Sequence, residues 1–137
     1  MKVLGISLEA STAVFSAIEN QNGQISEIGT YTRKIELKDH LDSAEVKQLQ
    51  TALHSFLDSM NFDRIGIIKR GTKGRFAASP ITFKIEGLIQ LYQNKEIEFI
   101  SQASIRAFYK KNTNPVNPKY SYQKVANGFA YYLLENK

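Results

Sequence analysis

The stretch Arg64-Ile65-Gly66-Ile67-Ile68-Lys69 decides the fold class of this chain. It is a nearly unbroken apolar run of strand length, as expected for a strand buried on both faces of a sheet. Before it, apolar side chains recur at intervals of three and four from Ser43 to Met60, which predicts an amphipathic helix with Ser43 as its N-cap. A helix followed by such a strand needs a crossover connection, so the pattern predicts parallel strands in an α/β domain.

Upstream of this helix, the sequence predicts three antiparallel strands. Residues 2–8 and 12–20 are two runs of β-forming residues joined by a turn-prone segment, which is typical of a β-hairpin. Asn22-Gly23 favours a type I′ turn, because both central residues of that turn need positive φ. It leads into an alternating stretch, 25–37, which we expect to be the third strand of a meander.

Downstream of Lys69, loops, helices and strands alternate. The predicted elements are a loop at 71–79, a helix from Pro80 to Tyr92, a strand at 96–101, a short helix at 104–111, a loop at 112–119 and a helix at 120–134. In the last helix, the apolar face is expected to contain Tyr122, Val125, Phe129 and Leu133. A meander followed by strand–helix units predicts one layered α/β domain over residues 1–137, with helices on both faces of the sheet.

Composition narrows the functional classes. The 137 residues contain no cysteine, which excludes disulfides, thiolate metal sites and a cysteine nucleophile. The apolar run near the N-terminus is only about six residues long and ends at Glu9, too short for a secretory signal or a membrane span. We therefore expect a cytoplasmic protein without a membrane partner.

The positive charge belongs to the second half of the chain. Residues 1–63 carry 5 Lys and Arg against 9 Asp and Glu, a net charge of −4, whereas residues 64–137 carry 13 against 4, a net charge of +9. Clustered cations release counterions from phosphates, so this asymmetry favours a polyanionic partner such as nucleic acid. An ordinary solvated basic face is the alternative interpretation.

The order of elements is that of the ribonuclease H-like fold, and local sequences support this resemblance. Val3-Leu4-Gly5-Ile6-Ser7 resembles the first strand of RuvC-type Holliday junction resolvases, and EFISQASIRAFYKKN at 98–112 resembles a later strand–helix unit. The whole chain is also similar to a family of small bacterial proteins, the domain-of-unknown-function family numbered three thousand and ten. The resemblance implies a ribonuclease H-like mixed sheet with three antiparallel strands, then parallel strands, and helices on both faces.

The resemblance also implies where a metal site would lie. The resolvases hold divalent metal with an Asp on the first strand, a Glu at the end of the fourth strand and Asp residues on the final helix. The matching residues here are Ser7, Lys69 and Asn127, with Lys124 as a further match on the helix. A hydroxyl, an ammonium group and an amide lack the negative charge that a hard cation requires, so we assign no catalytic residue, metal or cofactor.

A nuclease with rearranged carboxylates remains an alternative to an altered, inactive metal site. It would have to recruit Glu9, close to Ser7 at the end of the first strand, or Glu86 on the second helix. Both have simpler interpretations, as a turn residue and as a solvent-facing helix residue.

Two basic groups are the candidate nucleic-acid contacts. The first contains Lys69, Arg70, Lys73, Arg75 and Lys84, and the second contains Arg106, Lys110 and Lys111. The second group has Phe108 and Tyr109 interleaved, with Tyr120 and Tyr122 shortly after. Basic residues mixed with aromatic rings suit a groove for unpaired bases, but aromatic residues on helices more often pack inward, as we expect for Phe108 and Tyr122.

Three functions follow from these patterns. The first is a catalytically inactive ribonuclease H-like module that binds nucleic acid or another phosphate-bearing ligand through the basic half. The second is a protein-interaction or homodimeric scaffold module, and the third is the metal-dependent nuclease with rearranged carboxylates.

Overall fold

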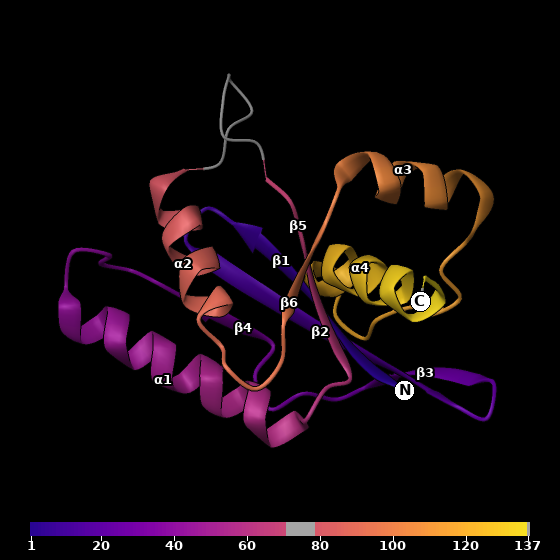
Figure 1. Cartoon of the computed structure of the whole chain (residues 1–137), viewed down its shortest axis with the longest axis horizontal. Coiled ribbons are helices and arrows are strands. Elements are labelled where there is room, and N and C mark those ends of the chain that lie inside the picture. Colours follow the sequence, from indigo (N-terminus) through magenta and orange to yellow (C-terminus); the bar gives the residue numbers. More distant parts are fainter. Residues whose placement is uncertain (71–78, 137) are drawn as a thin grey trace.

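The computed structural model describes residues 1–70 and 79–136, which form one mixed α/β layer structure (Figure 1). Its elements are β1 (Lys2–Glu9), β2 (Thr12–Gln21), β3 (Gln24–Ile28), β4 (Lys34–Glu36), α1 (Ser43–Met60), β5 (Arg64–Ile68), α2 (Pro80–Gln90), β6 (Ile97–Ile100), α3 (Gln102–Lys111), the 3-10 turn η1 (Ser121–Gln123) and α4 (Lys124–Glu135). The predicted α/β fold class is confirmed. Among the described residues, no helix is long and apolar enough to cross a bilayer.

The sheet has the order β3-β2-β1-β5-β6, and β4 also pairs with β2. β1 and β2 are antiparallel, whereas β1, β5 and β6 are parallel to one another, as the crossover argument predicts. Asn22 and Gly23 have φ values of 56° and 86°, which confirms a turn with two positive φ angles.

The expected third strand, 25–37, is wrong in one respect, because two strands replace it. β3 pairs with residues 17–21 of β2, and β4 pairs with residues 12–14 of the same strand. β2 has ten residues, so two short strands share its length. Residues 29–33 connect the two strands, and the Arg33 carbonyl oxygen still accepts a hydrogen bond of 2.8 Å from the Phe15 N–H of β2.

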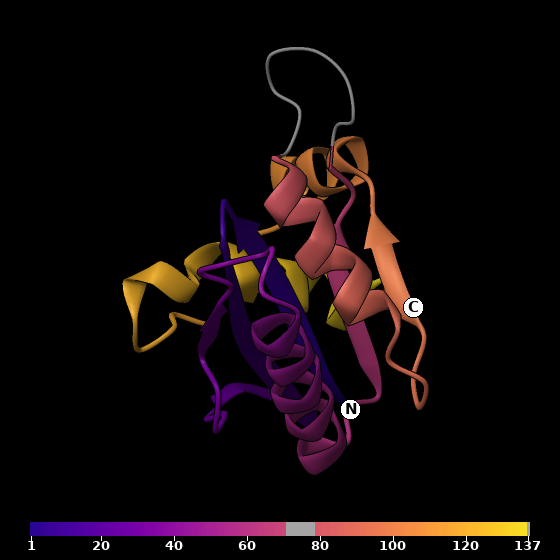
Figure 2. The same cartoon turned by 90° about the vertical axis from the view of Figure 1, so that its left-hand side faces the viewer.

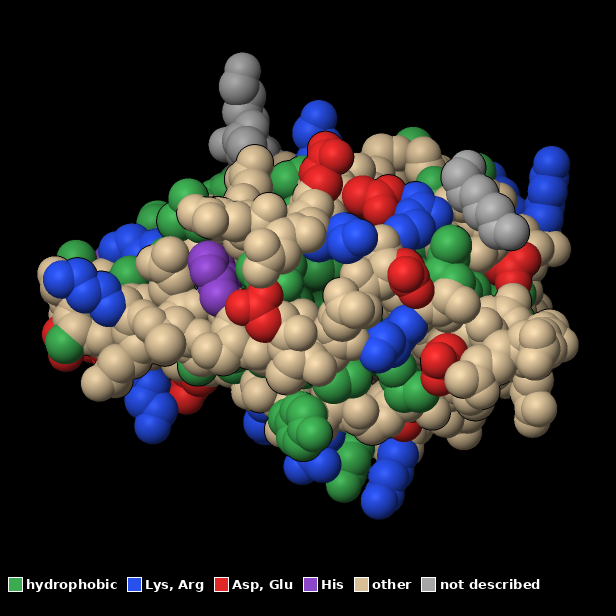
Figure 3. Space-filling view, turned by 60° about the horizontal axis from the view of Figure 1, so that its bottom comes forward, with side chains coloured by type: hydrophobic (Ala, Val, Ile, Leu, Met, Phe, Trp, Pro, Cys, Tyr) green, Lys and Arg blue, Asp and Glu red, His purple; other side chains and the backbone are tan. Residues whose placement is uncertain are grey.

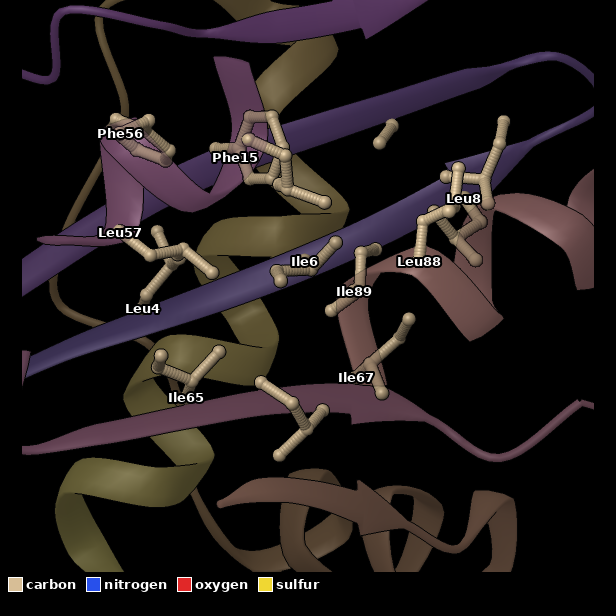
Figure 4. Packing of buried hydrophobic residues seen from close by; sticks show 14 of the residues in the cluster. Leu4, Ile6, Leu8, Phe15, Phe56, Leu57, Ile65, Ile67, Leu88 and Ile89 are labelled. Carbon is tan, nitrogen blue, oxygen red and sulfur yellow. The ribbon is translucent and has the colours of Figure 1, made fainter. Parts of the chain in front are cut away.

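The two faces of the sheet carry different helices. On one face, alternate side chains of β1 and β5 pack against α1 and α2 (Figure 4). Figure 4 shows Leu4, Ile6 and Ile67 on this side of the strands, with α4 behind the sheet. Figure 2 shows α1 and α2 together on their face, and the second hydrophobic cluster joins α3 and α4 to the opposite face.

Helix α1 begins one residue away from the predicted cap. The N-cap is Asp42, whose carboxylate accepts a hydrogen bond of 3.0 Å from the Ala44 N–H, while Ser43 is already helical. An aspartate at this position also places a negative charge at the positive end of the helix dipole, which a serine hydroxyl does not.

Helix α4 crosses the sheet along a row of small residues. Ser16, Gly5 and Gly66 lie side by side on β2, β1 and β5. A Cβ atom added at Gly5 would lie 1.9 Å from the Ala126 carbonyl oxygen, so the backbone of α4 rests directly on this strand. Only a glycine permits such a close approach.

This close approach corrects the predicted face of the last helix. The residues of α4 that lie on Gly5 are Ala126 and Ala130, which are fully buried. Phe129 and Leu133 are buried as expected, but Tyr122 and Val125 are 41% and 53% exposed. Small residues define the side of the helix that meets the strands, because large side chains would hold it too far away.

Arg64 anchors the far end of α4. Its guanidinium forms a two-point contact with Glu98, at 2.8 Å and 2.6 Å, and also donates to the Leu133 and Asn136 carbonyl oxygens. Hydrogen bonding to the Glu98 carboxylate raises the pKa of Arg64 above its usual range. A cation at the carbonyl end of a helix is favourable, so Arg64 ties β5, β6 and α4 together.

Candidate nucleic-acid interface at the carboxyl edge of the sheet

The carboxyl ends of the parallel strands bring distant residues to one edge of the sheet. Ile68 pairs with Ile100, so Lys69 follows β5 where α3 begins after β6. The Lys69 N–H donates to the Ile100 carbonyl oxygen at 2.7 Å, and Gln102 Nε2 lies 3.4 Å from the Lys69 carbonyl oxygen. Figure 1 shows the end of β5 and the helix α3 at the same end of the molecule.

The positions that match the metal site of the resolvases are not equivalent in their surroundings. Ser7 and Asn127 are buried, whereas Glu9 and Lys69 are exposed. Asn127 donates from Nδ2 to the Ser16 hydroxyl at 3.0 Å and accepts at Oδ1 from Asn114 Nδ2 at 2.7 Å. Its amide therefore joins α4, β2 and the loop after α3.

These donors do not fit a magnesium-type ion. Such an ion is held by charged oxygens, and here Ser7 offers a neutral hydroxyl and Lys69 an ammonium group. Asn127 has one amide oxygen, which already accepts a hydrogen bond inside the protein. Within residues 1–70 and 79–136, no group of three or more His, Asp or Glu side chains is placed to hold a metal ion.

Replacing Asn127 by alanine should destabilise the protein by about 1–3 kcal/mol, because it leaves the buried Ser16 hydroxyl and the partly buried Asn114 amide without their partner. The measurement is the urea midpoint of unfolding followed by circular dichroism. Asn117→Ala is the matched control, since Asn117 is exposed on the same loop. Equal midpoints for the two variants would contradict the proposed role of the amide.

Glu86 is not the solvent-facing residue that the helix pattern suggests. It is half-buried on α2, and its Oε2 has no hydrogen-bond partner among the described residues. Burial raises the pKa of this carboxyl group, and the positive charge of Arg70 partly opposes the shift. A carboxylate that is costly to ionise is a poor ligand for a hard cation unless charge is supplied nearby.

The described basic residues among the candidates lie on α3, at the end of β5 and on α2. Arg106, Lys110 and Lys111 are exposed on α3, and Arg106 and Lys110 share a helix face at a spacing of four. Lys69 and the partly exposed Arg70 follow β5 near the start of α3, and we call these five residues together the edge surface. Lys73 and Arg75 lie outside the described residues.

Lys84 lies apart from the edge surface. Its ammonium group donates to the His40 carbonyl oxygen at 2.7 Å and lies 3.0 Å from His40 Nδ1, on the α1 and α2 side of the sheet. The face in Figure 3, which brings the bottom of the view in Figure 1 forward, shows Lys and Arg interspersed with Asp and Glu. The electrostatic potential of that face is therefore mixed in sign and does not favour binding of a phosphate backbone.

The aromatic residues interleaved on α3 pack toward the protein interior. Phe108 packs inward as expected, against Tyr109, Tyr131 and Tyr132. Tyr109 donates from its hydroxyl to the Gly128 carbonyl oxygen, and burial raises the pKa of that hydroxyl. These two rings therefore position α3 on α4 and leave its basic side chains outward.

A second basic and aromatic surface was not predicted. The β3–β4 connection places Tyr31, Arg33 and Lys34 beside Tyr120 and Tyr122, which precede α4. The expectation that Tyr122 packs inward is wrong, because its ring stacks on Tyr120 instead. The sequence signal is the same alternation of aromatic and basic residues that stands out on α3, but it is divided between segments 31–34 and 119–122.

The comparisons with known proteins agree with this geometry. The model of a family described as "Protein of unknown function (DUF3010)" matches residues 1–133. No curated protein matches the chain by sequence.

Solved structures of DNA resolvases share the fold. RuvC of Thermus thermophilus in complex with a Holliday junction substrate is 10% identical, with a TM-score of 0.71 over 98% of this chain and 97% of that chain. RuvC of the same organism in a second structure is 8% identical, with a TM-score of 0.71 over 95% and 91%. The fowlpox virus resolvase with its Holliday junction DNA is 17% identical, with a TM-score of 0.51 over the full length of both chains. At these identities the likeness establishes the ribonuclease H-like, RuvC-like fold.

Proposed function

Because the chain belongs to the family described as "Protein of unknown function (DUF3010)", whose name assigns no activity, we propose its function from the fold and the site. It is a ribonuclease H-like module that binds nucleic acid through the edge surface and does not cleave it. The observation that carries the proposal is the exposed basic side of α3, a helix whose first residue, Gln102, contacts Lys69 at the carboxyl edge of the sheet.

Charge supports binding at this edge. Five cations, Lys69, Arg70, Arg106, Lys110 and Lys111, lie at the end of β5 and on α3, and the chain has no acidic residue between Glu98 and Glu135. Glu86 on α2 lies close enough to Arg70 to interact with its charge. Lys and Arg that neutralise phosphates supply most of the affinity of nonspecific nucleic-acid binding. Structural relatives with DNA in their solved structures make a DNA ligand the first one to test.

The chemistry of the altered metal positions supports binding without cleavage. Hydrolysis by two metal ions needs carboxylates that hold both ions beside the phosphate. Here Asn127 is committed to Ser16 and Asn114, and Lys69 adds positive charge at the end of β5. A cation at this place attracts a phosphate but repels a divalent metal.

The test is fluorescence anisotropy with a labelled four-way DNA junction and a linear duplex at 50 mM salt. We expect the protein to bind both, and the triple variant Arg106→Gln, Lys110→Gln, Lys111→Gln to bind at least about tenfold more weakly. The control Lys38→Gln, Lys47→Gln, Lys95→Gln removes the same charge from exposed positions outside α3 and should bind like the unmodified protein.

Other outcomes would favour the competing functions. Undetectable DNA binding, with a salt-independent dimer in native mass spectrometry, would support a homodimeric scaffold and overturn the proposal. Cleavage that depends on magnesium or manganese and is lost in Glu9→Gln would support a nuclease with rearranged carboxylates.

A further inference from the structure

We propose that the surface between the β3–β4 connection and the segment before α4 binds single-stranded nucleic acid, by stacking unpaired bases on Tyr31 and Tyr122. We call it the tyrosine groove: it is lined by Tyr31, Thr32, Arg33, Lys34 and Tyr122 and has a volume of about 380 Å³. The inference rests on the proposed binding of nucleic acid and assigns unpaired strands to a second surface, separate from α3.

The aromatic rings of this surface are available to a ligand. Tyr31 is 87% exposed and Tyr122 is 41% exposed, so two large rings face solvent at one groove. Exposed aromatic rings that line one groove offer the flat faces on which unpaired bases stack. Neither ring is needed to complete the hydrophobic core.

The rings are already arranged in a stack with cations on it. Tyr120 and Tyr122 have centroids 5.7 Å apart and planes inclined by 29°. The Arg33 guanidinium lies 4.2 Å from the centre of the Tyr120 ring, and the Lys34 ammonium lies 5.0 Å from that of Tyr122. A nucleobase presents the same kind of flat π face, so it can take the place of a cation on such a ring while the displaced cation meets its phosphates.

The segment that carries the tyrosines is held in place. The Lys119 N–H donates to Glu27 Oε1 at 3.3 Å, and Gln123 Nε2 donates to the Phe15 carbonyl oxygen at 2.7 Å. The Lys119 ammonium lies 5.5 Å from the centre of the Tyr120 ring. Both ends of this segment are therefore fixed to the sheet, which holds Tyr120 and Tyr122 in place before a ligand binds.

The chemistry favours unpaired strands over other polyanions. A duplex keeps its bases stacked inside and exposes its phosphate backbone. It would therefore contact Arg33 and Lys34 but make no stacking contact with the tyrosine rings. An acidic peptide would also use the cations without needing flat faces. The acidic residue nearest in sequence to the groove cations is Glu36, two residues after Lys34 on the exposed side of β4. It is not part of the groove lining, so the described lining of the groove contains no carboxylate.

The experiment compares a labelled 20-nucleotide oligo-dT strand with a linear duplex, by anisotropy at 50 mM salt. In the double variant Tyr31→Ala, Tyr122→Ala, we expect single-strand affinity to fall at least about tenfold, because base stacking on aromatic side chains is lost. Duplex affinity should stay within about twofold. Tyr122→Phe should retain single-strand binding, since the ring and not the hydroxyl does the stacking.

Two controls make the result specific. Leu41→Ala removes another exposed apolar side chain, 80% exposed and outside the groove, and should change neither affinity. The chain has seven tyrosines and no tryptophan, so tyrosine fluorescence should be quenched by oligo-dT in the unmodified protein and less so in the double variant. Unchanged circular dichroism in the double variant would show that the fold is intact.

The outcomes separate this inference from the proposed function. If the protein binds duplex through α3 but binds oligo-dT equally well with and without the two tyrosines, the tyrosine groove is wrong and the edge surface stands. If neither duplex nor oligo-dT binds the unmodified protein, both proposals fail together.

Discussion

Replacing Gly5 by alanine should destabilise the protein by about 3 kcal/mol or more, the upper end of the cost of overfilling a packed interior. The added Cβ would lie 1.9 Å from the Ala126 carbonyl oxygen and 2.7 Å from the Ala130 backbone nitrogen. Both are backbone atoms of α4, so no side chain can rotate away, and the helix must move off the sheet. The measurement is the urea midpoint of unfolding, followed by circular dichroism.

The other glycines provide a graded series of controls. At Gly66, the added Cβ would meet the Leu133 Cδ1 at 2.5 Å, a flexible side-chain atom, so alanine there should cost less than at Gly5. At Gly87, within α2, nothing lies within 4 Å, and alanine should stabilise the protein by about 0.5–1 kcal/mol through helix propensity. A Gly5→Ala midpoint equal to that of the unmodified protein would contradict the placement of α4.

Affinity for duplex DNA should fall by about 500-fold between 50 and 200 mM salt, the loss expected if the five cations of the edge surface each neutralise one phosphate. The logarithm of the binding constant then depends on the logarithm of the salt concentration with a slope of about −4.5. Anisotropy titrations at four salt concentrations measure this slope directly. A steep slope identifies counterion release as the source of the affinity.

The same titrations, repeated with variants, show which cations contact the DNA. Removing the three cations of α3 should reduce the slope to about −2, because only Lys69 and Arg70 of the described edge surface remain. The variant that changes Lys38, Lys47 and Lys95 should keep the original slope. A slope near zero in the unmodified protein, or equal slopes in both variants, would contradict binding through the edge surface.

The row Ser16, Gly5 and Gly66 determines the surroundings of Asn127. It brings α4 so close to the sheet that the residue after Ala126 is enclosed. The neutral amide of Asn127 links α4 to β2 and to the loop after α3. A buried amide with both ends bonded stabilises the fold at the place where a buried charge would need a cation.

Much of the fold was predictable because it depends on neighbours in the sequence. The three-and-four periodicity of α1, the apolar run of β5 and the turn at Asn22-Gly23 all reflect local geometry. The crossover rule then led from a helix and a buried strand to parallel pairing, without any knowledge of contacts. The match of Ser7 and Asn127 to metal positions came from the resemblance to the resolvases and not from this order of elements.

Only the tertiary structure decided which side chains of α4 are buried and what they do. Periodicity favoured Tyr122 and Val125, but the close approach of the helix to Gly5 selected Ala126 and Ala130. The hydrogen bond between Asn127 and Ser16 joins residues 111 positions apart, and the contact of Arg33 with Tyr120 joins two separate loops. Such contacts depend on strand register and on the path of a helix across the sheet, which a local pattern does not contain.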